Sequence, residues 1–224
     1  WQMIIKDNMT KDVITVSPDT TVPEALNLME EKGVRHLPVV EKDHLVGILS
    51  MLDLVRASPS PATSLSIWEL NYLLAKLPVK DIMSKNVVTV DAETPIDVAA
   101  ALMREHKIGG LPVVDEKGKL VGIATESDMF GAILEMFGVT RGGVRLTLEL
   151  PYQHAALVEA NQTFRNFGAE VVSLTVLPGN DEQNVGKSVW RLQNCDDVDA
   201  LLDYLREKGY RVTHVSGHNV CITK

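Results

Sequence analysis

The sequence has little cysteine, no long apolar run and a shortage of positive charge. Its two cysteines, Cys195 and Cys221, are too few for a disulfide framework and form no C-x-x-C pair. A reducing, cytoplasmic location is therefore expected. No apolar run approaches the roughly 20 residues that a membrane-spanning helix needs. The sequence thus predicts neither a membrane protein nor a disulfide-stabilised secreted one.

The shortage of positive charge excludes one class of partner. The 22 Lys and Arg face 30 Asp and Glu, for a formal net charge of −8, whereas binding along a phosphate backbone needs clustered Lys and Arg. A nucleic-acid partner is not expected. With 45% hydrophobic and 23% charged residues, the chain is predicted to be globular rather than disordered. Residues 1–6 lack the apolar region of a secretory signal, and Met3 is expected to be the natural first residue.

An internal repeat organises the first two thirds of the chain. The matching segments are Met9–Val16 with Met83–Val90, Leu37–Val40 with Leu111–Val114, and, after one inserted residue near Gly118, Leu45–Asp53 with Leu120–Asp128. Because the register holds through all three segments, one unit has been duplicated. The two copies are therefore predicted to have the same fold.

Each unit is predicted to have the order β-α-β-β-α. The β-rich runs 13–16 and 87–90 are expected to be strands. Thr21 and Glu24 fit a capping box at the start of a helix, and Thr94 is the expected N-cap in the second copy. Two compact apolar strands and a second helix follow.

The fold class expected is mixed α+β and α/β, with two paired repeats and a third element. Residues 3–57 and 79–138 form the repeats, which together cover an apolar face and leave paired clefts about a pseudo-twofold axis. Residues 58–78 are expected to be a linker and connecting helix, and 139–143 a hinge. Residues 144–224 predict the ferredoxin-like order β-α-β-β-α-β, with a second strand ended by Pro178-Gly179.

Candidate chemistry lies at two helix starts. Ser50 with Asp53, and Thr125 with Asp128, fit an N-cap and its acidic partner. This structural role alone would explain why these residue types occur here. The same geometry also suits a ligand, because helix N–H groups attract phosphate and a carboxylate accepts hydrogen bonds from two ribose hydroxyls. A glycine three residues before each hydroxyl is expected to let a ligand approach the backbone.

A basic pair favours the binding interpretation in the first copy. Arg35 and His36 enter the strand that is expected to line the first cleft, where they could neutralise a phosphate. The matching positions of the second copy are Gly109 and Gly110, which offer no side chain. The second cleft is therefore expected to lack these cations.

These motifs resemble a tandem cystathionine-β-synthase (CBS) domain pair, or Bateman module, over roughly residues 3–138. The resemblance implies that adenine nucleotides or S-adenosylmethionine bind in the clefts. It implies ribose contacts for Asp53 and Asp128, and phosphate-side contacts for Ser50, Thr125 and the Arg35-His36 pair. Candidates for the adenine pocket are Ile14, Val16, Leu37, Pro38, Val88, Val90, Leu111 and Pro112.

The last part of the chain, residues 144–224, resembles an ACT domain. That resemblance implies a homodimer and either amino-acid sensing or dimerisation alone. Ligand-binding members commonly have Pro-Gly after the first strand, whereas this chain has Pro151-Tyr152-Gln153-His154, so dimerisation alone is a competing interpretation. The whole arrangement is similar to the acetoin utilisation protein B (AcuB) family, which implies a link to acetoin catabolism.

The function expected is non-catalytic regulation, with an adenine nucleotide of the AMP, ADP or ATP class as ligand and no obligatory cofactor. The alternatives are an S-adenosylmethionine sensor and an interaction scaffold with degenerate clefts. An enzyme is disfavoured because no candidate nucleophile has a recognisable base beside it. No metal site is predicted, since His214, His218 and Cys221 are too widely spaced along a strand to share one ion.

Overall fold

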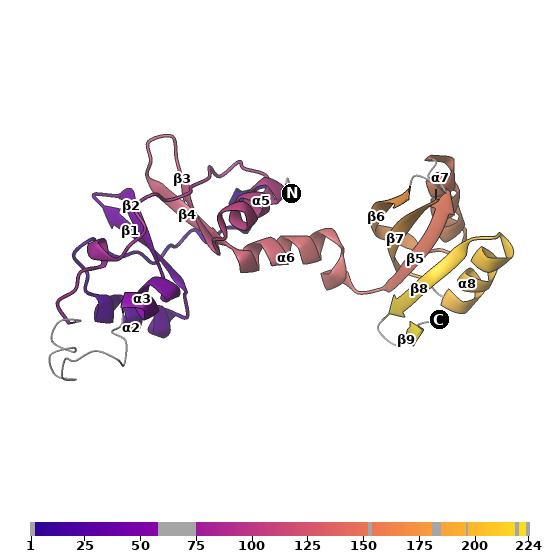
Figure 1. The fold of residues 1–224 in the computed structure, drawn as a ribbon. Helices are drawn as coiled ribbons and strands as arrows, with labels where there is room; N and C mark the ends of the chain where they lie inside the picture. The colour runs from indigo at the N-terminus through magenta and orange to yellow at the C-terminus, as the bar shows by residue number, and fades with distance from the viewer. Residues whose placement is uncertain are drawn as a thin grey trace. The chain divides into compact units, whose positions relative to one another are not determined.

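The chain divides into two compact units, Trp1–Ala132 and Ile133–Lys224 (Figure 1). The computed structural model describes residues 3–57, 75–151, 154–180, 185–195, 197–217 and 220–222. Among these residues, no helix combines the length and apolar character needed to cross a membrane. The connecting helix expected within 58–78 falls mostly on residues 58–74, outside the described residues.

The first unit contains both repeats except for the last residues of α6, and each repeat supplies a helix, an antiparallel strand pair and a second helix (Figure 1). The first repeat has α2 (Val22–Lys32), β1 (His36–Glu41), β2 (His44–Ser50) and α3 (Met51–Ala57). The second repeat has α5 (Ile96–His106), β3 (Gly110–Val114), β4 (Leu120–Thr125) and α6 (Glu126–Met136). Two short elements also occur, α1 (Ile5–Asn8) and η1 (Val79–Asp81).

The first helices of the two repeats begin differently. The capping box predicted for α2 is confirmed, since Thr21 N–H donates to Glu24 Oε2 (2.8 Å) and Thr21 Oγ1 accepts from Glu24 N–H (3.4 Å). The prediction of Thr94 as the N-cap of α5 is wrong, because Pro95 occupies that position without a side-chain cap. Ile96 N–H, one of the donors that the first turn of a helix leaves unpaired, donates to the carbonyl of Met3 (2.9 Å).

The strands predicted at 13–16 and 87–90 are wrong as strands. One residue of each run makes a parallel bridge, Val16 to Val39 and Val90 to Val113. The chain turns away at once, because Thr20 N–H bonds back to the carbonyl of Ser17 (3.1 Å), with a corresponding turn in the second repeat. A ladder therefore cannot extend, and each repeat has a two-stranded antiparallel sheet with one added bridge.

The segments that precede each repeat are exchanged between the repeats. Ile5 is fully buried in the core of the second repeat, and its N–H donates to the carbonyl of Thr94 (2.9 Å). Val79 is fully buried in the core of the first repeat, and its N–H donates to the carbonyl of Thr20 (2.8 Å). Separating the repeats would expose both side chains and break both hydrogen bonds, so the two repeats form one structural unit.

Two glycines allow this exchange. A Cβ on Gly47 would overlap the sulfur of Met83, and a Cβ on Gly122 would overlap the sulfur of Met9. Neither glycine lines a cavity at the helix starts. The expectation that these glycines admit a ligand is therefore wrong, because a methionine side chain from the other repeat occupies that space.

The second unit has a five-stranded antiparallel sheet with the order β6-β7-β5-β8-β9. Its elements are β5 (Val144–Pro151), α7 (His154–Asn166), β6 (Glu170–Asn180), β7 (Val185–Gln193), α8 (Val198–Glu207), β8 (Arg211–Gly217) and β9 (Val220–Ile222). The predicted order β-α-β-β-α-β is present, followed by the short β9. Phe164 of α7 and Leu201 of α8 share one core with Leu148 of β5 and Trp190 of β7.

One strand of the second unit extends beyond its predicted end. The prediction that Pro178-Gly179 ends a strand is wrong, because β6 continues to Asn180. A register shift between Leu177 and Asn180 accommodates Pro178, which has no N–H.

The residues expected to be a hinge, 139–143, are held to β7. Arg191 donates to the carbonyl of Gly142 (3.2 Å), and Gln193 donates to that of Arg141 (2.5 Å).

Replacement of Gly47 with alanine tests the exchanged packing. Because the new Cβ would overlap the Met83 thioether, we expect Gly47→Ala to lower the free energy of unfolding by about 1–3 kcal/mol. Urea denaturation measures this loss. The matched control is Gly131→Ala in α6, where a Cβ meets nothing within 4 Å and helix propensity favours alanine. Equal stabilities for the two variants would contradict the packing role of Gly47.

Candidate functional site

Two cavities lie at the helix starts that the sequence singles out. The larger, of about 520 Å³, lies at the start of α3, and the smaller, of about 250 Å³, lies at the start of α6. Small-molecule sites in proteins usually measure about 300–1,000 Å³. The larger cavity therefore falls within this range, and the smaller falls just below it.

Ser50 and Asp53 line the larger cavity and form a reciprocal cap. The N–H and Oγ of Ser50 both donate to Asp53 Oδ2, at 2.8 and 2.6 Å, and Asp53 N–H donates to Ser50 Oγ at 3.3 Å. The prediction that these two residues form an N-cap and its acidic partner is thus confirmed. Both side chains are nevertheless half-buried and remain partly accessible.

Thr125 and Asp128 line the smaller cavity and make two of these three hydrogen bonds. The N–H and Oγ1 of Thr125 donate to Asp128 Oδ2, at 2.7 and 2.8 Å. Within the described part of the chain, no hydrogen bond reaches Oδ1 of Asp128 or of Asp53. Each carboxylate therefore caps its helix with one oxygen and keeps the other for a further partner.

Each cavity takes its aspartate from one repeat and part of its apolar wall from the other. Val87 and Val88 of the second repeat line the larger cavity, and Val13 and Ile14 of the first repeat line the smaller. Among the adenine-pocket candidates, only Ile14 and Val88 therefore line these cavities. The other candidates are buried and line neither cavity: Val16, Leu37, Pro38, Val90, Leu111 and Pro112.

Arg35 and His36 line both cavities. The expectation that the second cleft lacks these cations is therefore wrong. The reason lies in the glycines of the second repeat, because a Cβ on Gly110 would come within 3.0 Å of the His36 ring, and one on Gly109 within 3.3 Å. Absence of side chains at these two positions leaves room for His36 where the two repeats meet.

Burial lowers the pKa of His36, and the neighbouring Arg35 guanidinium lowers it further. The carboxylates of Glu126 and Asp53 act in the opposite direction, but the desolvation of the imidazole dominates. His36 is therefore neutral at pH 7 in the unliganded chain. Arg35, which is exposed, supplies the permanent positive charge between the two cavities.

Two further cations of the larger cavity are absent from the sequence-based candidates. Arg56 lies three residues after Asp53 in α3, so the two side chains lie on one side of the helix. Lys107 ends α5 in a left-handed conformation (φ 55°), at the position that matches Gly33 of the first repeat. The helical spacing from Asp53 could have identified Arg56, whereas only the fold brings Lys107 to this cavity.

The described residues contain no group of three or more His, Cys, Asp or Glu side chains that could hold a metal ion. The available chemistry at the two cavities is therefore hydrogen bonding by carboxylates and hydroxyls, charge pairing by Arg and Lys, and contact with Val and Ile side chains. Such a combination suits a small ligand with an apolar part, hydroxyl groups and negative charge.

Known proteins share the duplicated part of the chain. A CBS domain is recognised over residues 4–60 and again over 79–135, about half of the chain. A CBS domain-containing protein of Dictyostelium discoideum is 35% identical over 136 residues, which cover 60% of this chain and 94% of that protein. The inosine-5'-monophosphate dehydrogenase of Korarchaeum cryptofilum is 40% identical over 120 residues, but this match covers only 22% of the enzyme.

Solved structures also match about 60% of this chain. CBSX2 in complex with AMP is 36% identical with a TM-score of 0.50, and the match covers 59% of this chain and 96% of that one. A Vibrio cholerae protein described as a candidate acetoin utilization protein (AcuB) is 30% identical with a TM-score of 0.52, covering 63% of this chain and 97% of that one. With two CBS domains in register with its internal repeat, the chain belongs to the CBS-domain family.

Proposed function

We propose that this chain is a non-catalytic regulatory protein that binds an adenine nucleotide of the AMP, ADP or ATP class in its CBS-pair cavities. The observation that carries the proposal is the half-buried carboxylate of Asp53. One of its oxygens caps α3, and the other accepts no hydrogen bond from the described residues. A carboxylate in this state can accept hydrogen bonds from the two hydroxyls of a ribose.

The rest of the larger cavity supports the same ligand. Val87 and Val88 offer an apolar wall for a base, while Arg35 offers positive charge for a phosphate. The solved structure of CBSX2 contains AMP, which shows that a structurally similar CBS pair accommodates such a ligand. Asp128, Thr125 and Ile14 supply the corresponding parts of the smaller cavity.

S-adenosylmethionine is the second candidate, and the smaller cavity favours it. Asp12 and Asp128 both line that cavity, against the single permanent cation of Arg35. Because the sulfonium group is positively charged, a carboxylate-rich lining suits it better than it suits a phosphate. A scaffold with degenerate cavities is the remaining alternative, and it predicts a protein partner without any small-molecule ligand.

The second unit is proposed to be an ACT-like domain that dimerises or binds a second small ligand. Its antiparallel sheet and its order of elements support this assignment. The similarity to the Vibrio cholerae protein supports a link to acetoin utilization. Through a homodimer of this unit, a ligand-dependent change in the CBS pair could reach a partner protein, provided that the ligand binds the two arrangements with different affinity.

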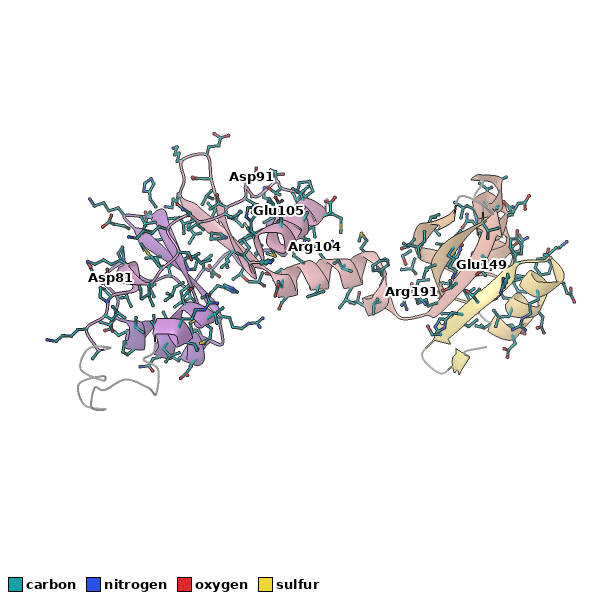
Figure 2. All side chains as sticks on the ribbon, viewed as in Figure 1. Asp81, Asp91, Arg104, Glu105, Glu149 and Arg191 are labelled. Atoms are coloured by element: carbon teal, nitrogen blue, oxygen red, sulfur yellow. The ribbon has the colours of Figure 1, made fainter. Side chains whose placement is uncertain are left out.

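Replacement of Asp53 tests nucleotide binding. AMP, ADP or ATP at about 100 times its dissociation constant should stabilise the native chain by about 2.7 kcal/mol, and a thermal-shift assay measures this directly. We expect Asp53→Asn to remove the part of the shift that comes from the larger cavity, because the ribose there loses its carboxylate while the cap is largely retained. Asp91→Asn is the matched control, since Asp91 is an exposed carboxylate that lines neither cavity (Figure 2). A full shift in Asp53→Asn would contradict the assignment.

The charge state of His36 predicts a pH dependence of stability. Since the pKa of His36 is lowered in the native chain, the unfolded chain binds more protons there once the pH falls to the ordinary value of about 6.5. The free energy of unfolding should therefore fall between pH 7.5 and 5.5. We expect this fall to be smaller in His36→Gln than in His106→Gln, a control at the exposed end of α5, in thermal denaturation. Identical profiles would show that His36 does not titrate as described.

A further inference from the structure

The linings of the two cavities correspond residue by residue through the internal repeat. The residues of the larger cavity and their repeat matches in the smaller are Ser84 with Thr10, Val87 with Val13, Val88 with Ile14, Ile108 with Val34, Ser50 with Thr125, and Asp53 with Asp128. These pairs conserve polarity, and each keeps its place at the helix start or wall. The parts that would contact a base and a ribose are therefore equivalent in the two cavities.

At three positions the two linings differ in charge, and each difference makes the larger cavity more positive than the smaller. Lys107 of the larger cavity corresponds to Gly33 of the smaller. Arg56 of the larger cavity corresponds to Gly131, which offers no side chain. The third position is neutral Asn86 in the larger cavity and acidic Asp12 in the smaller.

The result is a difference in sign between the two linings. In the larger cavity, Arg35, Arg56 and Lys107 outnumber the carboxylates of Asp53 and Glu126. In the smaller cavity, Arg35 faces the two carboxylates of Asp12 and Asp128. The larger cavity also has about twice the volume, about 520 Å³ against about 250 Å³.

The extra cations are available to a ligand. Within the described residues, neither Arg56 nor Lys107 has a carboxylate within 4 Å of its charged group. Both side chains are exposed. Neither is needed to bind a base or a ribose, because the smaller cavity has the corresponding groups without them. Their chemistry, a guanidinium and an ammonium beside a nucleotide-sized cavity, suits phosphate oxygens.

We propose that Arg56 and Lys107 make the larger cavity selective for an adenine nucleotide with two or three phosphates. The smaller cavity takes an adenosyl ligand with one phosphate or none. This inference rests on the proposed function. It adds how many phosphates the ligand of the larger cavity has and which residues bind them. Arg35, which lines both cavities, does not distinguish them.

Isothermal titration calorimetry of the full chain with AMP, ADP and ATP in magnesium-free buffer tests the proposal. We expect the native chain to bind ADP and ATP more tightly than AMP at one site. Arg56→Gln and Lys107→Gln should each weaken ATP binding about tenfold, as expected for one lost charge-assisted hydrogen bond, while AMP affinity changes little. The control is Arg104→Gln, an exposed arginine of α5 that lines neither cavity (Figure 2). It should leave all three affinities unchanged.

The outcomes separate this proposal from the function on which it rests. If AMP, ADP and ATP bind with equal affinity, and both glutamine variants behave like Arg104→Gln, the selectivity is overturned while nucleotide binding stands. If none of the three nucleotides binds the native chain, the proposed function fails and the selectivity fails with it. A loss of ATP affinity in Arg56→Gln and Lys107→Gln, with AMP affinity retained, supports both.

Discussion

The exchange of segments between the two repeats is the interaction on which the first unit depends. Ile5 completes the core of the second repeat and Val79 completes that of the first. The residues that follow each exchanged segment, Val13 and Ile14 in one case and Val87 and Val88 in the other, then line a cavity beside the aspartate of the opposite repeat. Each cavity is lined by residues of both repeats, so the site requires the pair.

The centre of the pair shows how a duplicated fold can acquire two different sites. Each repeat contributes the same helix start, with a hydroxyl and a carboxylate held by the same hydrogen bonds. Where the repeats meet, the first places Arg35 and His36, and the second places two glycines that make room for the imidazole. Because one copy has side chains where the other has space, the pair can be closely packed at its centre and still carry unequal charge on its two sides.

Much of this architecture could be predicted from the sequence, because the repeat and the capping residues act locally. The register of the duplication, the Thr21 capping box and the positions of Asp53 and Asp128 at helix starts all follow from spacing along the chain. The order of elements in the second unit likewise follows from apolar periodicity and from the turns that interrupt it.

The remaining features depend on contacts between segments that are distant in sequence. The first N–H of α5, that of Ile96, donates to the carbonyl of Met3, which no local pattern at Thr94 reveals. The glycine of each motif admits a methionine from the other repeat, a role that is indistinguishable in sequence from ligand approach. Lys107 reaches the larger cavity only because the repeats pair. Pairing also decides that Arg35 lines both cavities.

A crystal structure of the chain grown with saturating ADP would locate the nucleotide. We expect ADP in the cavity at the start of α3, with a ribose hydroxyl about 3 Å from the Asp53 carboxylate and the phosphates beside Arg56 and Lys107. A larger cavity that contains only water under these conditions, or ADP bound away from Asp53, would contradict the proposed site.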